Sequence, residues 1–482
     1  MWLAWLQLLS LNAPSTRHSL LQEAERAHTA ELTSATAAAF VGGTEAALRS
    51  GPRQELEFVA HDVGMQYAGP DSEILGSASA SVHISTDSVL TPIECLSIRL
   101  EAEKAMARGL SSDFTYTDLA RVGEVHVADL PASCDLLRRK LESTLLPAIA
   151  ECFALDASSL RVRDAVVVQY DAAREATRQP VHRDEALVSF SIPLSARAEY
   201  GGGGTIFEGS GAVFTPPMGR LLCHASGMRH AGNAISRGVR WMLVVFLIAS
   251  DVPQLARRCA HIAARAATEA AEAEAEATEA AEAAGEELGD DVNAEVEAAR
   301  QRAREALSTA LTLAPSDFQL HHDYGLLLMD EGDAAGARAA FMRAARLYPS
   351  CPRPHAALAM VLRVYGRPRA ALRRYEAART AVARHGGGQD RNLALEIASG
   401  VAHCVLALRQ RRQPPDAAAR SAEAADDRIA GRSTREVAGW LRDALAAMGS
   451  VENEQTDEAR MLLRDLEVAA AAPQTKASVV AA

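Results

Sequence analysis

A histidine and an aspartate two positions apart could share one metal ion. The segment Pro180–Asp184 reads Pro-Val-His-Arg-Asp, with the potential ligands His182 and Asp184 at positions i and i+2. In an extended chain such residues point to the same face, so an imidazole nitrogen and a carboxylate oxygen can reach one ion. A His-x-Asp pair also occurs often by chance, and a surface histidine is the alternative interpretation. The surrounding sequence has to decide between the two.

A third ligand must come from another part of the chain. His230, within Met228–Gly232, lies 46 residues after Asp184, where a second strand pair is expected to begin. Two histidines and one carboxylate on one face of an octahedron leave three positions open, which suits non-haem Fe(II) and oxygen chemistry. We predict His182, Asp184 and His230 as metal ligands, and no catalytic side chain besides them.

Two further residues could bind a small molecule next to such a metal. Arg240 is the one charged residue within the apolar run Val239–Leu247. Burying a guanidinium without a partner is costly, so an anion should meet it, and arginine suits a carboxylate that binds through both oxygens. A structural ion pair with an internal Asp or Glu is the alternative. Tyr170 ends the apolar run Ala165–Tyr170 and is either a core aromatic or a hydrogen-bonding partner of a bound ligand.

Short apolar runs separated by turn residues have to position these side chains. Such a pattern is typical of a barrel or a two-sheet jelly roll, and the runs are Ala165–Tyr170, Leu187–Leu194, Gly204–Glu208, Ala212–Phe214, Arg220–His224 and Val239–Leu247. The glycines of Glu199–Phe207 favour a tight turn over a phosphate cradle, because no Gly-Lys-Ser/Thr follows them. Apolar residues at helical spacing in Pro92–Leu110 and Leu136–Phe153 predict two helices before the strands. The expected fold class is α+β, a jelly roll buttressed by helices.

The C-terminal half has a different amino-acid composition. Glu269–Glu297 contains twelve acidic residues and no Lys, Arg or His, which equals the net charge of −12 of the whole chain. Its Ala/Glu composition predicts a solvated helical spacer. After it, small and aromatic residues recur at a shift of 34, which resembles the tetratricopeptide repeat of paired helices; they are Ala303, Ala337 and Ala371, Leu307, Phe341 and Tyr375, and Ala310, Ala344 and Ala378.

Composition also excludes several classes. Outside the acidic segment the charges sum to about zero, so no basic patch predicts a nucleic-acid partner. The seven cysteines are scattered without a CxxC pair, which favours small buried side chains over a disulfide framework or a zinc site. The apolar residues 1–13 are too short to span a bilayer, and no later segment predicts a membrane span. For these residues a secretory or organellar targeting segment and a local helix in a cytoplasmic protein both stay open.

Together the residues resemble the prolyl 4-hydroxylase-like branch of the 2-oxoglutarate/Fe(II) oxygenases. The resemblance covers about Leu90–Ser250, and it rests on Tyr170, His182-x-Asp184, the glycine run ending in Thr-x-Phe207, Pro217-x-Gly219, His230-Ala-Gly232 and Gly238-x-Arg240. It implies a double-stranded β-helix in which the three ligands hold Fe(2+). Arg240 would bind the distal carboxylate of 2-oxoglutarate, and Tyr170 would contact this co-substrate. It also implies O2 as co-substrate, succinate and CO2 as products, and L-ascorbate as a reductant of the iron.

The resulting prediction is a hydroxylase of a protein side chain such as proline. The expected domains are an N-terminal region (residues 1–88), the dioxygenase domain (89–251), the acidic linker (252–299), the repeats (300–410) and a helical cap with a disordered tail (411–482). The repeats would bind a protein partner or the peptide substrate. In animal collagen-type enzymes of this branch, helical repeats precede the catalytic domain, whereas here they follow it. Trp241 also stands where a Tyr is common, which should affect packing alone.

Three alternatives remain. Hydroxylation of a small molecule is open, since related jelly rolls share the iron site and differ in the loops around the substrate. The chain could also be a repeat-based interaction scaffold with an inactive oxygenase domain. A cupin-type metal site, with a His-x-His pair, does not match the aspartate at position 184.

Overall fold

The computed structural model describes residues 15–40, 56–63, 72–110, 112–115, 121–174, 176–208, 210, 212–284, 290–384, 391–412, 428–429, 432–449 and 453–471. Residue contacts divide the chain into two compact units, Met1–Leu327 and Leu328–Ala482. Each unit is described by itself. The N-terminal apolar run and the predicted tail after residue 471 lie outside the described residues.

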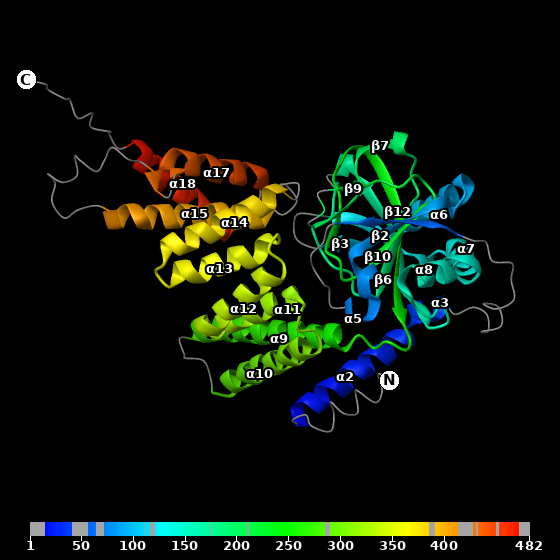
Figure 1. The fold of residues 1–482 in the computed structure, drawn as a ribbon, viewed down its shortest axis with the longest axis horizontal. Helices are drawn as coiled ribbons and strands as arrows, with labels where there is room; N and C mark the ends of the chain where they lie inside the picture. The colour runs from blue at the N-terminus through cyan, green and yellow to red at the C-terminus, as the bar shows by residue number, and fades with distance from the viewer. Residues whose placement is uncertain are drawn as a thin grey trace, which may run out of the picture. The chain divides into compact units, whose positions relative to one another are not determined.

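A nine-stranded antiparallel sheet forms the centre of the first unit (Figure 1). Its strand order is β1-β2-β10-β6-β12-β5-β4-β3, and β7 pairs with one end of β12. The strands are β1 (Phe58–Asp62), β2 (Ser81–Ser88), β3 (Ser112–Thr115), β4 (Arg121–His126), β5 (Leu160–Asp171), β6 (Val188–Pro193), β7 (Tyr200–Gly202), β10 (Arg220–Ala225) and β12 (Ile235–Ala249). The apolar strand β12 lies between β6 and β5, as expected of a strand buried on both faces.

A smaller antiparallel sheet completes the jelly roll. It consists of β8 (Thr205–Phe207), β9 (Val213–Phe214) and β11 (His230–Gly232), in the order β11-β8-β9. The glycine run before β8 is a tight turn, with φ near +73° at Gly202 and Gly203 and +103° at Gly204. Only glycine adopts these angles without strain, so the turn interpretation of this run agrees with its backbone.

Three helices cover one face of the large sheet. They are α6 (Pro92–Ala107), α7 (Pro131–Lys140) and α8 (Leu146–Phe153), the last two joined by a π-helical turn over Leu141–Leu145. A Cβ on Gly123 of β4 would lie 3.4 Å from Met106 Cε of α6. Because neighbouring residues of a strand point to opposite faces, Glu124 and His126 of β4 face away from this helix. The other face of the sheet is therefore the one available for a site.

A second group of helices in this unit has its own apolar core. It contains α2 (Ser15–Leu32), α9 (Leu255–Ala284), α10 (Asp290–Leu313) and the beginning of α11 (Phe318–Asp330). Buried residues of all four helices meet in this core, among them Leu21, Ile262, Leu307 and Leu320. The described parts of the acidic segment, residues 269–284 and 290–297, are helical, as its composition predicts, and α9 packs along α10. The short helices α3 (Ala35–Ala39) and α5 (Ser72–Leu75) complete the unit.

The second unit is almost entirely helical. It contains α12 (Ala334–Leu347), α13 (Pro352–Val364), α14 (Pro368–Arg384), α15 (Arg391–Arg412), α17 (Thr434–Met448) and α18 (Glu454–Ala471), with a two-stranded ribbon of β13 (Arg428–Ile429) and β14 (Arg432–Ser433). The repeat positions Ala337, Phe341, Ala344, Tyr375 and Ala378 are all buried. Helical pairs with small and aromatic contacts agree with the repeat pattern, and its assignment as tetratricopeptide repeats stays a prediction.

The fold class is the predicted one, an antiparallel jelly roll with buttressing helices and a C-terminal helical region. The predicted domain boundaries stay a prediction. Among the helices of the described residues, one could cross a membrane by length and composition, over Asn392–Gln410 of α15, and 56% of this stretch is buried inside the protein. It packs against α14, α17 and α18, which is how the core helix of a helical domain behaves.

Candidate metal centre and its cavity

Backbone pairing brings the three predicted metal ligands together. The N–H of His182 donates to the carbonyl of His230 at 2.9 Å, and the N–H of His230 donates back to the carbonyl of His182 at 2.9 Å. This reciprocal pair places the two imidazoles side by side, with ring centroids 4.5 Å apart. The N–H of Asp184 donates to the carbonyl of Ser226 at 3.1 Å, which holds the aspartate against the loop before β11.

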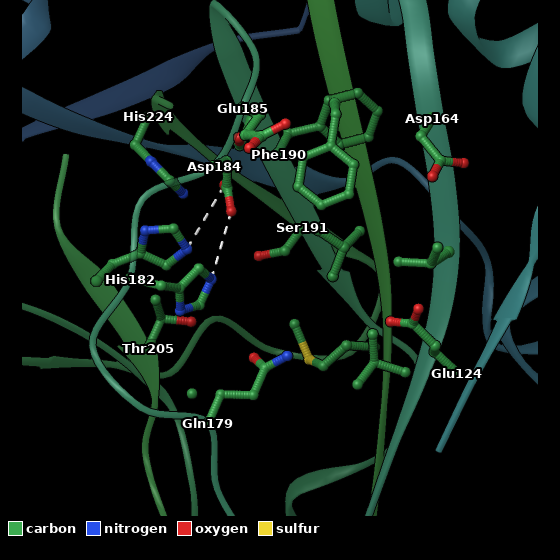
Figure 2. A pocket seen from close by; sticks show the side chains of 18 of the residues that line it. Glu124, Asp164, Gln179, His182, Asp184, Glu185, Phe190, Ser191, Thr205 and His224 are labelled. Atoms are coloured by element: carbon green, nitrogen blue, oxygen red, sulfur yellow. Dashed lines mark ion pairs between the residues drawn. The ribbon is translucent and has the colours of Figure 1, made fainter. Parts of the chain in front are cut away.

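The three side chains converge on one point. His182 Nε2 lies 3.4 Å from Asp184 Oδ1, and His230 Nε2 lies 3.6 Å from Asp184 Oδ2. All three donor atoms lie within 4.8 Å of one another. Figure 2 shows the Asp184 carboxylate facing both imidazoles at one side of the cavity. The i, i+2 spacing of His182 and Asp184 therefore places both residues on the same side of the chain, as expected from an extended segment.

Both histidines present the same nitrogen to this point. His182 Nδ1 lies 2.9 Å from the carbonyl oxygen of Pro180, and His230 Nδ1 lies 3.0 Å from that of Met228. A carbonyl can only accept, so each Nδ1 carries the proton and each Nε2 keeps its lone pair. Such hydrogen bonds are how proteins fix the tautomer and orientation of metal-binding histidines.

The electrostatics of the cluster also favour a cation. Burial lowers the pKa of His230 to about 3, so this imidazole is neutral at neutral pH. Burial also tends to raise the pKa of Asp184, but the neighbouring His230 and His182 outweigh it and hold the pKa of this carboxyl far below its usual range. Neutral imidazole and ionised carboxylate are the forms that bind metals.

The cluster lies in a cavity of about 540 Å³ between the sheets. Cross-strand pairing explains which residues line it, because Tyr170, Val168 and Val166 of β5 stand opposite Arg240, Met242 and Val244 of β12. These residues alternate along their strands and share the face turned away from α6. Arg240 and Tyr170 thus lie towards one end of the cavity, and Asp164 and Phe246, also paired, lie towards the other.

Arg240 is the least satisfied polar side chain of the cavity. The residue is 3% exposed, and its Nε and Nη1 have no hydrogen-bond acceptor within the part of the chain that the structure describes. Its guanidinium carbon lies 5.1 Å from the centre of the Tyr170 ring. The alternative of an internal ion pair is not what these residues show. Two buried N–H groups without an acceptor favour an anionic ligand in this cavity, and its binding by Arg240 stays a prediction.

The backbone at Gly203 lies close to the side chain of Arg240. A Cβ on Gly203 would lie 3.3 Å from Arg240 Cδ and 2.8 Å from the Tyr200 ring, so only glycine fits between them. The Tyr170 hydroxyl donates to Gln179 Oε1 at 2.6 Å, and both residues line the cavity. Burial raises the pKa of Tyr170, so it stays a neutral donor. Its contact with a bound ligand stays a prediction.

Several cavity residues escaped the sequence analysis. His224 of β10 is buried, with its ring centroid 4.5 Å from that of His230, and burial lowers its pKa. At the end far from Arg240, His126 Nδ1 lies 3.1 Å from Asp164 Oδ1, beside the buried Glu124. One sequence signal could have identified these residues. Polar side chains at alternate positions of an otherwise apolar strand are expected to face a cavity. For β4 no strand was predicted, so this signal was not available.

Comparisons with known proteins gave matches among solved structures, each over about a third of this chain. No family model matches the sequence, and no curated protein matches it either. Among solved structures, the non-haem α-ketoglutarate-dependent carbocyclase SnoK from nogalamycin biosynthesis is 16% identical, with a TM-score of 0.29, over 34% of this chain and 78% of that one. A viral collagen prolyl hydroxylase from Paramecium Bursaria Chlorella virus-1, in a 2OG complex, is 16% identical, with a TM-score of 0.27, over 36% and 98%.

A prolyl-4-hydroxylase from Pseudomonas putida is 15% identical, with a TM-score of 0.28, over 36% of this chain and 94% of that one. At these values the similarity identifies no activity. The chain itself forms a jelly roll that encloses a His–Asp–His cluster and, in the same cavity, a buried arginine whose Nε and Nη1 have no acceptor among the described residues.

Proposed function

We propose that this protein is a 2-oxoglutarate- and O2-dependent oxygenase that uses non-haem Fe(II). The single observation that carries the proposal is Arg240, a buried guanidinium with two unpaired nitrogens in the cavity that also holds His182, Asp184 and His230. A metal cluster alone would suit many reactions. A metal cluster with a buried cationic anchor for a carboxylate suits a co-substrate that chelates the metal at one end and carries a carboxylate at the other.

The residues present fit both groups. Two Nε2 lone pairs and one ionised carboxylate form the donor set of the 2-His-1-carboxylate type. The orphaned Arg240 nitrogens provide the donors that a distal carboxylate of 2-oxoglutarate would accept. When bound, iron and 2-oxoglutarate supply the oxidising power to insert one oxygen atom of O2 into a C–H bond, with release of succinate and CO2.

The protein's own residues contribute binding and orientation. Arg240 holds the anionic end of the co-substrate, and the neutral Tyr170 hydroxyl keeps Gln179 in place through its hydrogen bond. Val166, Val168, Met242 and Val244 form an apolar floor between the two ends of the cavity. An apolar floor keeps water away from the reacting C–H bond.

The finer part of the proposal concerns the substrate. We propose a protein side chain such as proline, with L-ascorbate as reductant, on the strength of the sequence resemblance to prolyl 4-hydroxylases. The helical region would recruit the substrate or a partner protein. Incubation of the enzyme with a proteolytic peptide mixture and with small metabolites, followed by mass spectrometry, tests this. A gain of one oxygen on peptides supports the proposal, and a gain confined to small molecules overturns the protein-substrate part.

The decisive experiment is an anaerobic titration of the purified protein with Fe(II) and 2-oxoglutarate. We expect a weak visible charge-transfer band in the wild type and, in air, slow release of succinate without substrate. His182→Ala should abolish the band by removing an iron ligand. Arg240→Gln should keep iron binding but weaken 2-oxoglutarate binding, by roughly 100-fold if it removes a charge-assisted bidentate contact of about 3 kcal/mol.

Arg237→Gln is the matched control. Arg237 lies on the same strand, β12, but is exposed and does not line the cavity. It should behave like the wild type in both measurements. A wild type with neither the band nor succinate release would overturn the enzymatic proposal and leave the interaction scaffold with an inactive oxygenase domain.

A further inference from the structure

Each segment that carries a metal ligand also carries a charged residue directly beside it. Arg183 stands between His182 and Asp184, Arg229 precedes His230, and Glu185 follows Asp184. The two guanidinium groups cannot bind a metal ion, since they are always protonated, and the Glu185 carboxylate pairs with Arg163 and His261. What they contact therefore shows what holds the ligand segments in place.

Arg183 is held by the residue before helix α11. Its Nη2 donates to Asp317 Oδ1 at 3.2 Å and its Nη1 to Asp317 Oδ2 at 3.3 Å, a two-pronged ion pair. The Asp317 side chain is only 1% exposed. The Phe318 ring stacks beside the same guanidinium, with its centre 5.4 Å from Arg183 Cζ. These contacts all lie inside the first compact unit.

Arg229 reaches the same turn of α11. Its Nε donates to Glu208 Oε2 at 2.7 Å, with both side chains less than a tenth exposed. Its Nη1 donates to Gln319 Oε1 at 3.4 Å. The backbone N–H of Gln319 in turn donates to Asp317 Oδ1 at 2.9 Å. The contacts of Arg183 and those of Arg229 therefore both lead to Asp317. Three consecutive residues, Asp317–Gln319, thereby connect the His182–Asp184 segment with the His230 segment.

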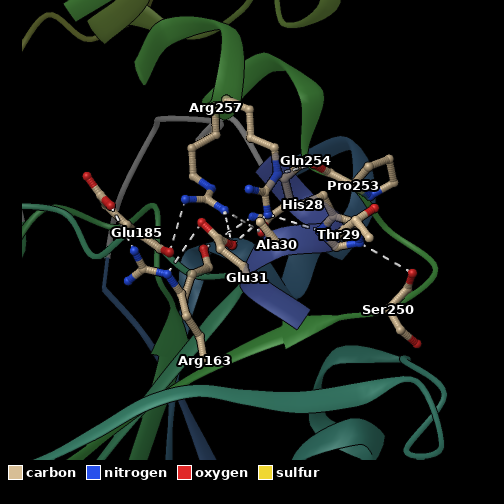
Figure 3. Close-up of polar contacts among 12 residues, drawn as sticks. His28, Thr29, Ala30, Glu31, Arg163, Glu185, Ser250, Pro253, Gln254 and Arg257 are labelled. Atoms are coloured by element: carbon tan, nitrogen blue, oxygen red, sulfur yellow. Dashed lines mark hydrogen bonds and ion pairs between the residues drawn. The ribbon is translucent and has the colours of Figure 1, made fainter. Parts of the chain in front are cut away.

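A second cluster holds the opposite end of the His182–Asp184 segment. Glu185 pairs with Arg163 of β5 at 3.0 Å and with His261 of α9 at 3.3 Å, and its carbonyl accepts from Arg257 of α9. Glu31 of α2 pairs with Arg163 and Arg257, both at 3.6 Å. Figure 3 shows Glu31 among these arginines, next to Glu185. The segment is thus attached to helices on both sides of Asp184.

Anchoring the flanking residues fixes the direction of the ligands. The His182–Asp184 segment pairs with its neighbours through few backbone bonds, since the His182–His230 bridge is isolated. A segment without a continuous row of backbone hydrogen bonds to a neighbouring strand can rotate about its own axis. Such a rotation would turn both His182 and Asp184 out of position. An ion pair on the residue between them opposes this rotation. Metal binding tolerates little of it, because productive geometry requires placement within about 0.5 Å.

We infer that Asp317, with Gln319, is a positioning residue of the metal centre, so that these two side chains at the start of α11 are part of what holds the metal ligands in place. This inference rests on the proposed function for the existence of the metal site. It goes beyond it by assigning a role at the site to a residue 87 positions after the last ligand, in a region that the sequence predicts to be a separate repeat domain.

The test uses the full-length protein and Co(II), whose visible absorption reports the geometry of its ligands and which needs no turnover. Asp317→Asn should weaken Co(II) binding by roughly 10-fold, as substitutions in the shell around metal ligands do, and should alter the absorption of the bound ion. Gln319→Ala removes only the hydrogen bond with Arg229 and should have a smaller effect in the same direction. It also provides the test if Asp317→Asn does not fold.

Two control variants separate positioning from general destabilisation. Leu320→Ala removes a buried side chain of the same helix, in the apolar core with α2 and α9, and does not touch the ligand segments. Glu23→Gln breaks the ion pair of 2.7 Å that joins α2 to Arg302 of α10. Both should keep the Co(II) affinity and absorption of the wild type, and Leu320→Ala should still lower the unfolding temperature.

The outcomes distinguish this inference from the proposed function. If the wild type binds Co(II), and Asp317→Asn and Gln319→Ala bind it with unchanged affinity and absorption, the positioning role is wrong and the proposed function stands. Equal losses in Asp317→Asn and Leu320→Ala would also overturn the role, since the effect would follow stability alone. A wild type that binds neither Co(II) nor Fe(II) overturns both.

Discussion

At the scale of single residues, the cavity depends on side chains that touch across strands. Gly232 comes two positions after His230, and it is buried against Tyr170. A Cβ at this position would overlap the Tyr170 hydroxyl and lie 2.8 Å from Tyr170 Cζ. The ring is itself fixed, since its hydroxyl bonds to Gln179 and its face lies next to Arg240. Gly232 is therefore the residue that lets the metal-ligand strand approach the proposed co-substrate pocket.

We predict that Gly232→Ala destabilises the protein by about 1–3 kcal/mol, the usual cost of overpacking a core. It should also displace Tyr170 and weaken 2-oxoglutarate binding more than Fe(II) binding, because the clash lies on the Arg240 side. Denaturant unfolding and the anaerobic titration measure the two effects. Gly123→Ala is the control, since its Cβ would meet the ends of two flexible side chains, Met106 Cε at 3.4 Å and Gln169 Oε1 at 3.7 Å. Equal stability of the two variants would contradict the close approach.

His126 and Asp164 form the ionisable pair at the other end of the cavity. The hydrogen bond that His126 Nδ1 donates to the Asp164 carboxylate raises the pKa of His126, although burial works against it. A raised pKa in the folded state means that protonation stabilises the fold. The contribution is complete below the unfolded pKa of about 6.5 and is lost as the pH rises through the folded value.

We therefore predict that His126→Gln lowers the unfolding temperature most at about pH 6, and that the difference from the wild type shrinks towards about pH 8.5. Asp164→Asn should remove the same pH-dependent part, because it removes the partner. Thermal unfolding across this pH range, with an NMR titration of the imidazole, measures it. Parallel curves for wild type and variant over the whole range would show that the pair makes no pH-dependent contribution.

The sequence allowed the three side chains of the cluster to be predicted, and less of their surroundings. His182, Asp184 and His230 could be named because the i, i+2 rule is local and their motifs are short. Arg240 could be named because a charge in an apolar strand is conspicuous. Asp317 could not, since it contributes through a contact 134 residues away in sequence. No local pattern encodes which distant carboxylate an arginine will meet.

At the scale of elements, the missed strands have a common cause. The strand β2 reads Ser-Val-His-Ile-Ser-Thr-Asp-Ser, and β1 and β4 are also mixed in polarity. The strand β1 lies at an edge of the large sheet, and β2 and β4 are each second from an edge, with a paired strand on both sides. By contrast β12 lies in the middle of the sheet, between β6 and β5; it is apolar and was predicted from its composition. Position in the sheet, which the local sequence does not state, decides how apolar a strand must be.

Helix packing in the second unit depends on small residues in the same way. Gly400 of α15 faces Tyr375 of α14, and a Cβ there would overlap the ring, with Tyr375 Cε1 at 2.6 Å. Tyr375 is one of the aromatic positions of the predicted repeat and is 2% exposed. The glycine thus lets the next helix approach a repeat aromatic closely. This contact also explains how α15 can continue the stack of helices.

We predict that Gly400→Ala destabilises the second unit by about 1–3 kcal/mol through overpacking. The matched control is Gly439→Ala in α17, where a Cβ would meet nothing within 4 Å. It should stabilise the protein by about 0.5–1 kcal/mol, since glycine inside a helix costs that much relative to alanine. Denaturant unfolding followed by circular dichroism measures both. A stabilised Gly400→Ala variant would show that α14 and α15 are not in close contact.

At the scale of the whole molecule, the metal site belongs entirely to one of the two compact units. All residues that line its cavity, and Asp317–Gln319 which support it, precede Leu328. The second unit has its own buried core around Phe341, Tyr375, Leu395 and Leu441. Ligands that bind only the folded form stabilise the unit that contains their site. The two units should therefore respond to different perturbations.

We predict that Co(II) together with 2-oxoglutarate raises the unfolding temperature of one calorimetric transition and leaves a second one in place. At concentrations 100 times the dissociation constant the stabilisation of the first unit should be about 2.7 kcal/mol. Gly400→Ala should do the reverse, lowering the second transition and leaving the ligand-sensitive one unchanged. Arg240→Gln should abolish the part of the shift that is due to 2-oxoglutarate. A single transition that responds to both the ligands and Gly400→Ala would mean that the two units unfold together. The second unit would then contribute to the stability of the proposed metal site, in addition to the contacts of Asp317.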